Sequence, residues 1–241
     1  MPTLESRNLH KSFGRKEVVR GVSFAMHSGE IVGFLGPNGA GKTTVFYMIV
    51  GFIRPTAGDV YLDERRMTRE PMYRRSRAGI AYLPQEASVF RKMTVEDNIM
   101  AILEMRGDLS RRAQRERLEY LLDELGIREN RRQKAYTLSG GERRRTEIAR
   151  SLATEPHFLL LDEPFAGIDP IAVYEIKQIV RGLSSKGIGV LITDHNVRDT
   201  MEITHRSYIV KDGEIVVSGT REEITANEIA RRVYLGETFE L

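Results

Sequence analysis

Nine consecutive residues have the types and spacing of a phosphate-binding loop. They match the pattern G-x-x-x-x-G-K-[ST], follow the apolar run 31–35 and lead into a helical stretch, which is the context that this motif requires. Glycines let backbone N–H groups approach phosphate oxygens, Lys42 reaches the outer phosphates, and Thr43 offers a hydroxyl to Mg²⁺. We therefore predict an ATP or GTP site at Gly36, Pro37, Asn38, Gly39, Ala40, Gly41, Lys42, Thr43 and Thr44.

Two adjacent carboxylates end the apolar run "FLLLDEP" at residues 158–164. Ligands of α/β sheets bind at the carboxyl ends of the strands, so this run would deliver Asp162 next to the phosphate-binding loop. Consecutive strand side chains point in different directions, and the two acids should therefore have different roles. We expect Asp162 to support the Mg²⁺ coordination shell and Glu163 to polarise the attacking water.

The segment "LSGGE", residues 138–142, starts a strongly helical stretch with two glycines. Ser139 and Glu142 have the S-x-x-E spacing of a capping box, which by itself is a structural explanation for these two residues. A capping box has no need of Gly140 and Gly141, and glycine in a helix interior costs roughly 1 kcal/mol relative to alanine. Missing side chains at a helix N-terminus leave room for a phosphate, so we interpret residues 138–142 as a second phosphate contact.

The pattern of strand and helix segments around these residues predicts an α/β fold. The chain has 241 residues, 41% of them hydrophobic and 29% charged, and strand-length apolar runs alternate with helical patterns. It has no cysteine, so neither a disulfide framework nor a thiolate metal site is expected. The first twenty residues lack a secretory signal, and no window approaches the roughly 18 apolar residues of a membrane span. These features favour a cytoplasmic protein.

Predicted strands and helices follow from periodicity and capping signals. The predicted strands cover residues 4–13, 22–26, 30–35, a segment near 60, 80–83, 158–161 and 190–193. Predicted helices begin at Thr94, with Asp97 completing a capping box, at Ser110, at Ser139, at Asp169-Pro170 and at Arg221, the last running to Leu235, and a hairpin turns at Asp212-Gly213. We treat residues 1–241 as one domain, with a nucleotide-binding core from about 1–85 and 155–241 and an inserted helical subdomain from about 86–154.

The segment "LSGGE" shortly before "LLLDEP", with a phosphate-binding loop upstream, resembles the nucleotide-binding subunits of ABC transporters. The motifs follow the order of that family over most of the chain. Gln85 in "YLPQE" stands at the position of the Q-loop glutamine, His195 in "ITDHN" at that of the switch histidine, and residues 166–170 at the D-loop. Phe13 in "KSFG" stands where an aromatic residue, more often tyrosine, stacks on adenine. The resemblance implies an α/β fold: a P-loop NTPase core of the ABC type, with an N-terminal antiparallel β subdomain and an inserted α-helical subdomain.

The same resemblance implies a division of labour among these residues. Glu163 would be the general base, and His195 would contact the γ-phosphate. Ser139 and Gly141 would contact the γ-phosphate of ATP held by a second copy of the chain, so that a homodimer encloses two ATP molecules. The implied metal ligands are Thr43, Gln85 and Asp162.

Several segments resemble more specifically the ATPases of lipopolysaccharide export in Gram-negative bacteria. These segments are "PQEASVFRKMTVEDNI", "DEPFAGIDPIAV", "LITDHNVRDT" and "RRVYLGETFEL", of which "VYLGE" followed by Phe-x-Leu is the most discriminating. The ATPases of branched-chain amino-acid importers share the core motifs and a similar ending, and are the alternative. The resemblance implies a peripheral position on the cytoplasmic face of the inner membrane. It also implies two integral membrane subunits docking near Gln85 to Arg91, in a groove that includes Val89 and Phe90.

Arginines gather between Arg106 and Arg150, which permits either a basic face or a solvated helical face with interspersed acids. A soluble ATPase acting on nucleic acid or ribosomes is the alternative from another class. Direct contact with nucleic acid is not expected, because the chain lacks the long heptads, zinc-binding cysteines or second cassette usual in such proteins. A regulatory module without turnover is disfavoured by the presence of both Glu163 and His195.

Overall fold

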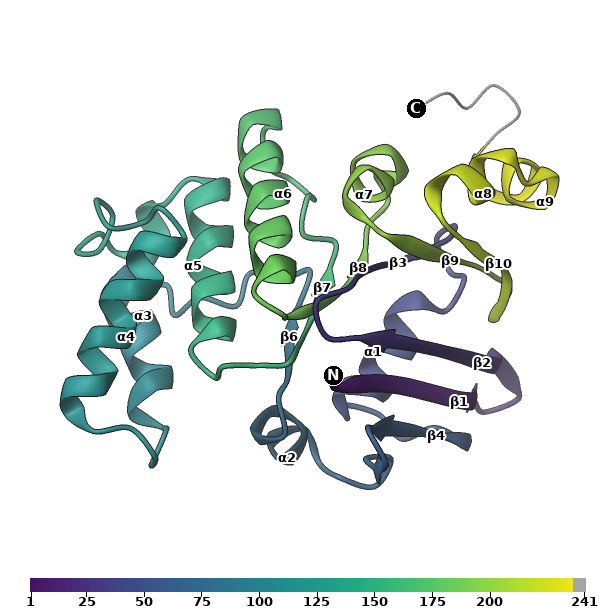
Figure 1. Cartoon of the computed structure of the whole chain (residues 1–241), viewed down its shortest axis with the longest axis horizontal. Coiled ribbons are helices and arrows are strands. Elements are labelled where there is room, and N and C mark those ends of the chain that lie inside the picture. Colours follow the sequence, from purple (N-terminus) through teal and green to yellow (C-terminus); the bar gives the residue numbers. More distant parts are fainter. Residues whose placement is uncertain (236–241) are drawn as a thin grey trace.

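Two β-sheets with helices packed around them make up residues 1–235, the part of the chain that the computed structural model describes (Figure 1). The strands are β1 (Thr3–Phe13), β2 (Lys16–His27), β3 (Ile31–Leu35), β4 (Ala57–Leu62), β5 (Arg65–Arg66), β6 (Ile80–Leu83), β7 (Phe158–Asp162), β8 (Gly189–Thr193), β9 (Arg206–Lys211) and β10 (Glu214–Gly219). The α-helices are α1 (Lys42–Val50), α2 (Met72–Arg77), α3 (Val95–Glu104), α4 (Arg111–Glu124), α5 (Gly140–Leu152), α6 (Pro170–Ser185), α7 (Val197–Ile203), α8 (Arg221–Ala226) and α9 (Glu228–Ala230). A 3₁₀ turn, Ala135–Thr137, precedes α5, and a π-helical turn, Arg231–Leu235, follows α9.

Strand register brings the ends of the parallel strands to a common edge. The first sheet is antiparallel with the order β2-β1-β4-β5, and the second has the order β10-β9-β3-β8-β7-β6, parallel except for the β9–β10 hairpin. Strands β3, β7 and β8 are buried along their whole length, which is typical of parallel strands covered on both faces. Asp162 at the end of β7 pairs with Thr193 at the end of β8. The residues that follow β3, β6, β7 and β8 therefore emerge together.

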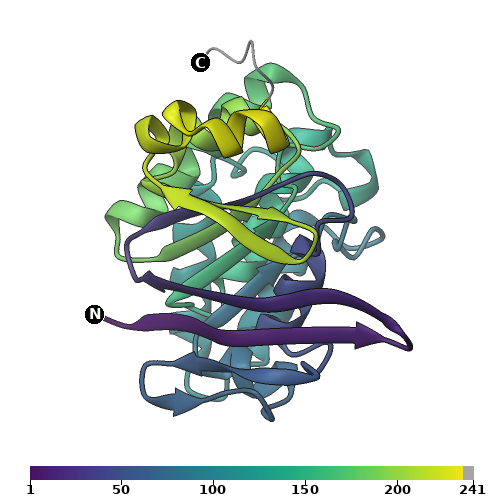
Figure 2. The ribbon, with the colours of Figure 1, turned by 90° about the vertical axis from the view of Figure 1, so that its right-hand side faces the viewer.

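Helix α1 joins the two sheets through one hydrophobic core. Its buried residues Phe46 and Ile49 share that core with Leu9 of β1 and Leu160 of β7. Figure 2 shows the strands of the first sheet crossing the molecule below the β9–β10 hairpin. Since α1 begins at Lys42, packing against both sheets fixes the position at which the phosphate-binding loop ends.

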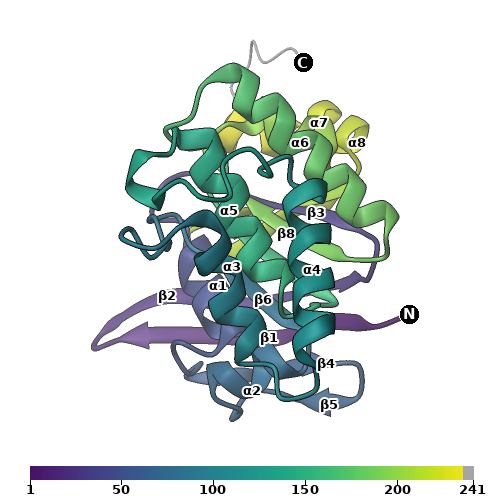
Figure 3. The ribbon, with the colours of Figure 1, turned by 90° about the vertical axis from the view of Figure 1, so that its left-hand side faces the viewer.

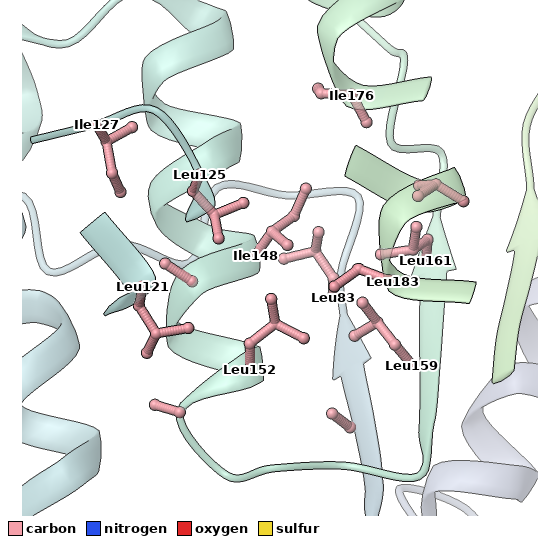
Figure 4. Close-up of a cluster of buried hydrophobic side chains, with 14 of the residues drawn as sticks. Leu83, Leu121, Leu125, Ile127, Ile148, Leu152, Leu159, Leu161, Ile176 and Leu183 are labelled. Atoms are coloured by element: carbon pink, nitrogen blue, oxygen red, sulfur yellow. The ribbon is translucent and has the colours of Figure 1, made fainter. Parts of the chain in front are cut away.

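Helices α3, α4 and α5 lie together at one end of the second sheet (Figures 1 and 3). Their apolar faces meet the strands: Leu121 of α4 and Ile148 and Leu152 of α5 belong to one cluster with Leu83 of β6 and Leu159 of β7 (Figure 4). Helix α5 also packs against α6. The helical segment thus shares a continuous core with the strands that precede the predicted glutamine and carboxylates.

Local capping signals start elements where the sequence predicts them. Thr94 and Asp97 form a capping box for α3, with hydrogen bonds of 3.0 and 3.2 Å between side chains and backbone N–H groups. Asp169 caps α6, whose first residue is Pro170. The hairpin turns at residues 212–213, both of which have positive φ. The structure confirms these three predictions. Each could be made from the sequence because a cap or a tight turn depends on neighbouring residues alone.

Other parts of the secondary structure differ from the prediction. Strand β2 begins at Lys16 rather than Val22, because its pairing with β1 continues to the hairpin. The predicted helical stretch 221–235 is helical but not continuous: Asn227 is extended, with φ −81° and ψ 121°, and its side chain caps the next helix by accepting from the Ala230 N–H. Helices α2 and α7 are absent from the prediction, since each is too short to show apolar periodicity.

Helix α2 is held by a buried arginine. Arg75 is 1% exposed, and its guanidinium donates to the backbone carbonyls of Met48, Ile49, Thr68 and Glu70 at 2.5–3.0 Å. Burial lowers the pKa of Arg75 to about 10. Met48 and Ile49 lie in the last turn of α1, where carbonyls have no partner within the helix and a positive charge complements the helix dipole. Arg75 therefore caps the helix that starts at the phosphate-binding loop.

Two further predictions concern the C-terminal motif and membrane-spanning helices. The motif "VYLGE" with Phe-x-Leu extends into residues 236–241, which lie outside the described residues. Between residues 1 and 235, no helix is both long and apolar enough to cross a bilayer.

Candidate functional site

The loop 36–44 leaves β3 and enters α1, as predicted. Gly41 is the N-cap residue of α1 and has a φ of 100°, a conformation that L side chains rarely adopt. A Cβ there would lie 2.9 Å from the Val18 carbonyl oxygen, so the position requires glycine. A glycine N-cap also leaves the first N–H groups of α1 free of a capping side chain, which suits an anion-binding loop.

Lys42 is a nearly buried cation at the start of α1. The residue is 9% exposed, and its Nζ donates to the carbonyl oxygens of Gly36 at 2.7 Å and Pro37 at 3.0 Å. Burial lowers the pKa of Lys42, and the negative charges of Glu163 and Asp162 act in the opposite direction. The ammonium therefore lies in the loop, close to the two predicted carboxylates.

Asp162 ends β7 in a buried position. It is 2% exposed, and the Tyr82 hydroxyl on β6 donates to its Oδ2 at 3.0 Å. Burial raises the pKa of Asp162, while the hydrogen bond from Tyr82 and the charge of Lys42 lower it. The structure thus places Asp162 beside the loop, and it adds a partner, Tyr82, that sequence reasoning missed.

Glu163 leaves the strand in a strained conformation. Its φ is 46°, in the left-handed region, which costs a non-glycine residue on the order of 1–3 kcal/mol. The backbone is held there by a hydrogen bond from the Glu163 N–H to the Thr193 carbonyl at 2.8 Å. On the side chain, Gln85 Nε2 donates to Glu163 Oε2 at 2.8 Å, and His195 Nδ1 lies 3.5 Å from the same oxygen. In this backbone conformation the Glu163 side chain lies beside the glutamine and the histidine, whereas Asp162 contacts Tyr82. The two acids therefore have different surroundings.

A third acid, Asp194, belongs to this edge and was missed by sequence reasoning. It is fully buried, accepts from the Phe165 N–H at 3.0 Å and the Asn196 N–H at 2.8 Å, and lies 3.4 Å from His195 Nδ1. Burial raises the pKa of Asp194, and these backbone hydrogen bonds lower it. The signal was present in the sequence, because Asp194 follows the buried strand β8 as Glu163 follows β7.

Arg144 connects helix α5 to the strand ends. It is 6% exposed and donates to the carbonyl oxygens of Pro84 at 2.8 Å and Asp162 at 3.0 Å, and to Glu147 Oε2 at 3.2 Å. Glu147 in turn accepts from the Ser88 N–H at 2.6 Å. Residues on α5 therefore hold both sides of the loop that carries the predicted Q-loop glutamine.

The helix that begins at "LSGGE" has the predicted capping box. Glu142 accepts from the Ser139 N–H at 2.8 Å, and Ser139 Oγ accepts from the Glu142 N–H at 3.3 Å. Ser139 is exposed, whereas Gly141 is buried. A Cβ on Gly141 would lie 2.7 Å from the Cβ of Ala172 on α6. Close packing against Ala172 within one chain therefore also requires glycine at position 141. The sequence-based interpretation considered only room for a phosphate.

Most of the predicted site residues lie at one sheet edge, whereas Phe13 and the start of α5 lie elsewhere. The structure brings loop 36–44, Gln85, Asp162, Glu163 and His195 to one edge of the second sheet. Phe13 lies instead on the first sheet, at the β1–β2 hairpin, and is 52% exposed. The same hairpin carries Val18, whose carbonyl faces Gly41, so the exposed ring belongs to an edge that adjoins the loop. The tip of α5, residues 139–142, makes its own capping hydrogen bonds and contacts α6.

The donor set at the edge suits Mg²⁺. Thr43 offers a hydroxyl, Gln85 an amide oxygen and Asp162 a carboxylate, and Mg²⁺ is commonly bound through one or two carboxylates together with substrate phosphates. Among residues 1–235, no group of three or more His, Cys, Asp and Glu side chains is placed to hold a metal ion. A site with a single carboxylate is consistent with a metal that is completed by nucleotide phosphates.

The arginines between Arg106 and Arg150 are largely paired with acids or buried. Arg145, for example, pairs with Glu175, and Arg150 stacks over the Phe90 ring with its guanidinium carbon 4.5 Å from the ring centroid. The other ion pairs of this stretch join Arg106 to Asp108 and Glu155, Arg112 to Glu116, Arg117 to Glu155, Arg128 to Glu119 and Asp123, Arg131 to Glu96 and Glu119, and Arg144 to Glu147. This pairing favours a solvated helical face over a basic surface for nucleic acid.

Comparison with known proteins gives a consistent result. The ABC transporter family pattern matches residues 19–166. A Haemophilus influenzae protein named the lipopolysaccharide export system ATP-binding protein LptB is 52% identical over 241 residues, with 100% of both chains covered. The crystal structure of the ADP conformation of an ABC transporter's ATP-binding cassette has a TM-score of 0.87 and 29% identity, over 98% of this chain and 100% of that one. A dimeric post-hydrolysis cassette bound to ADP and Pi has a TM-score of 0.80 and 25% identity, over 90% of this chain and 98% of that one.

The contact between α5 and α6 predicts that substitutions at positions 141 and 172 have non-additive effects on the free energy of unfolding. Gly141→Ala should lower the free energy of unfolding by about 1–3 kcal/mol, because the new methyl group meets Ala172. Adding Ala172→Gly should restore part of the loss, and urea denaturation of the two single variants and the double variant measures the coupling. Gly182→Ala on α6 is the matched control, because its Cβ would have no atom within 4 Å, so it should be neutral or stabilising. Additive effects at positions 141 and 172 would show that the two helices do not press on each other there.

Proposed function

The chain belongs to the ABC transporter family, and we propose that it is the ATP-hydrolysing subunit of a lipopolysaccharide exporter. One observation carries the proposal: Lys42, Glu163 and His195 converge at one sheet edge in a chain that aligns along its full length with a lipopolysaccharide-export ATPase. The alternative of a branched-chain amino-acid importer has no support among the compared relatives. A nucleic-acid ATPase is disfavoured by the paired arginines.

The residues at the edge divide the work of ATP hydrolysis. Loop 36–44 binds the phosphates through the first N–H groups of α1 and through Lys42. Glu163 takes the proton of the attacking water, and Gln85 holds the Glu163 carboxylate in place through its 2.8 Å hydrogen bond. His195, beside the same carboxylate, contacts the γ-phosphate. Bound Mg²⁺ would neutralise charge on the phosphates, and Thr43, Gln85 and Asp162 would hold it.

The tip of α5 is directed to a second copy of the chain. Ser139 is exposed at the helix N-terminus, and its side chain caps its own helix without any hydrogen bond to loop 36–44 among residues 1–235. A head-to-tail homodimer would place Ser139, Gly140 and Gly141 over the ATP held by the partner's loop. The similar cassette bound to ADP and Pi is dimeric, which supports a dimer of this chain by analogy.

A surface beside the Q-loop suits a helix of a membrane subunit. Phe90 is 47% exposed and is held at its backbone by Asn98, so it is not a core residue. The prediction that Val89 lines this surface is wrong, because Val89 is 7% exposed and belongs to the hydrophobic core. Docking of two membrane subunits there would give the chain its peripheral position on the cytoplasmic face of the inner membrane.

Glu163→Gln should retain ATP and lose turnover by about 10²–10⁴-fold, because an amide does not accept the proton of the attacking water. With Mg-ATP the variant should accumulate as a dimer, measured by size-exclusion chromatography with light scattering and by phosphate release. Glu64→Gln, on the exposed surface of the first sheet, is the control and should hydrolyse ATP normally. Rapid hydrolysis by Glu163→Gln would remove Glu163 from its role as the base.

The cargo is tested in a reconstituted complex. The chain should co-purify with two membrane subunits, and in proteoliposomes that complex should extract lipopolysaccharide in an ATP-dependent manner, with no extraction by a complex carrying Glu163→Gln. Radiolabelled leucine uptake is the parallel measurement for the importer alternative. ATP-driven leucine uptake without lipopolysaccharide extraction would contradict the proposed cargo while leaving the ATPase assignment intact.

A further inference from the structure

Tyr82 connects the strand before the Q-loop to the carboxylate that supports the metal. It lies on β6, which pairs in parallel with β7, and its hydroxyl donates to Asp162 Oδ2 at 3.0 Å. In the register Tyr82 stands opposite Leu160, so Asp162 is two residues further along β7. The long phenol side chain spans this offset and reaches the end of the neighbouring strand.

The ring of Tyr82 contacts two aromatic residues near the end of α1. Tyr47 and Phe52 contact it edge to face, with ring centroids 6.2 and 5.8 Å away and interplanar angles of 86° and 80°. Tyr47 and Phe52 also contact each other, at 5.4 Å and 76°. Edge-to-face pairs at these separations are favourable arrangements for aromatic rings. The hydroxyl is therefore positioned by the same helix that begins at Lys42.

The hydrogen bond opposes the cost of burying Asp162. A carboxylate that is 2% exposed has little contact with water, so its oxygens depend on donors of the protein for hydrogen bonds. A donor that binds the ionised form stabilises it, and the Tyr82 hydroxyl is such a donor. The proposal therefore depends on the position of the hydroxyl, which the register of β6 and β7 and the contacts with Tyr47 and Phe52 fix.

We propose that Tyr82 is a positioning residue for Asp162: its hydroxyl fixes Oδ2 and so leaves Oδ1 directed to the Mg²⁺ shell of the bound nucleotide. This inference rests on the proposed function, because it assumes a nucleotide-bound metal at Asp162. Partners that orient metal ligands act through affinity, and their loss commonly weakens metal binding by about 10–100-fold. Tyr82 touches neither the metal nor the reacting atoms, so it acts on the metal through Asp162.

Tyr82→Phe removes the hydroxyl and keeps the ring that packs against Tyr47 and Phe52. The dissociation constant of Mn²⁺, a paramagnetic probe for the Mg²⁺ site, is measured by electron paramagnetic resonance in the presence of saturating ADP. The variant should bind Mn²⁺ about tenfold or more weakly than the wild type. Its affinity for fluorescent ADP in EDTA should be unchanged, since loop 36–44 is untouched. Tyr61→Phe on β4 is the matched control and should behave as wild type in both measurements.

The outcomes separate a positioning role from a purely structural one. A lower melting temperature for Tyr82→Phe with unchanged Mn²⁺ affinity would overturn the proposal, because the hydroxyl would then contribute to stability alone. Failure of the wild-type chain to bind Mn²⁺ with ADP would overturn the proposed function and this inference together. Wild-type binding with equal affinity in Tyr82→Phe would overturn only the inference.

Discussion

The parallel register of β3, β8, β7 and β6 is the constraint on which the site depends. Because parallel strands end at a common edge, loop 36–44, the Q-loop and the carboxylates after β7 and β8 meet although they lie far apart in sequence. The register also holds Glu163 in its left-handed conformation, since its N–H is bonded to the Thr193 carbonyl of the next strand. A slip of one residue would turn these side chains to the opposite face of the sheet.

Opposite charges at this edge offset the free-energy cost of burying one another. Burial raises the pKa values of Asp162 and Asp194 and lowers those of Lys42 and Arg144, so it acts against the charged form of each group. Placed together, the acids and cations favour the ionised forms of one another. Hydrogen bonds from Tyr82 to Asp162, and from backbone N–H groups to Asp194, add to this effect. A triphosphate would bring further negative charge next to Lys42, which the N–H groups of α1 and a bound cation would offset.

Features set by neighbouring residues could be predicted from the sequence, whereas features set by packing could not. The phosphate-binding loop, the caps of α3 and α5 and the buried strand before Asp162 depend on local pattern, and the structure has them. Tyr82, Arg144 and the contact of Gly141 with Ala172 depend on which elements lie side by side, which periodicity does not encode. Helices α2 and α7 are short and are held by tertiary partners, as Arg75 shows for α2.

The central claim is that each ATP lies between the loop of one chain and the α5 tip of another. An equimolar mixture of Ser139→Arg and Lys42→Ala chains, both also carrying Glu163→Gln, tests it most directly, because the mixed dimer has one intact composite site. Analytical ultracentrifugation with Mg-ATP should show little dimer for either variant alone and a dimer fraction of about half or less in the mixture, as mass action for one site allows. Dimers of either variant alone that equal the Glu163→Gln parent, or a mixture that stays monomeric, would contradict the shared site.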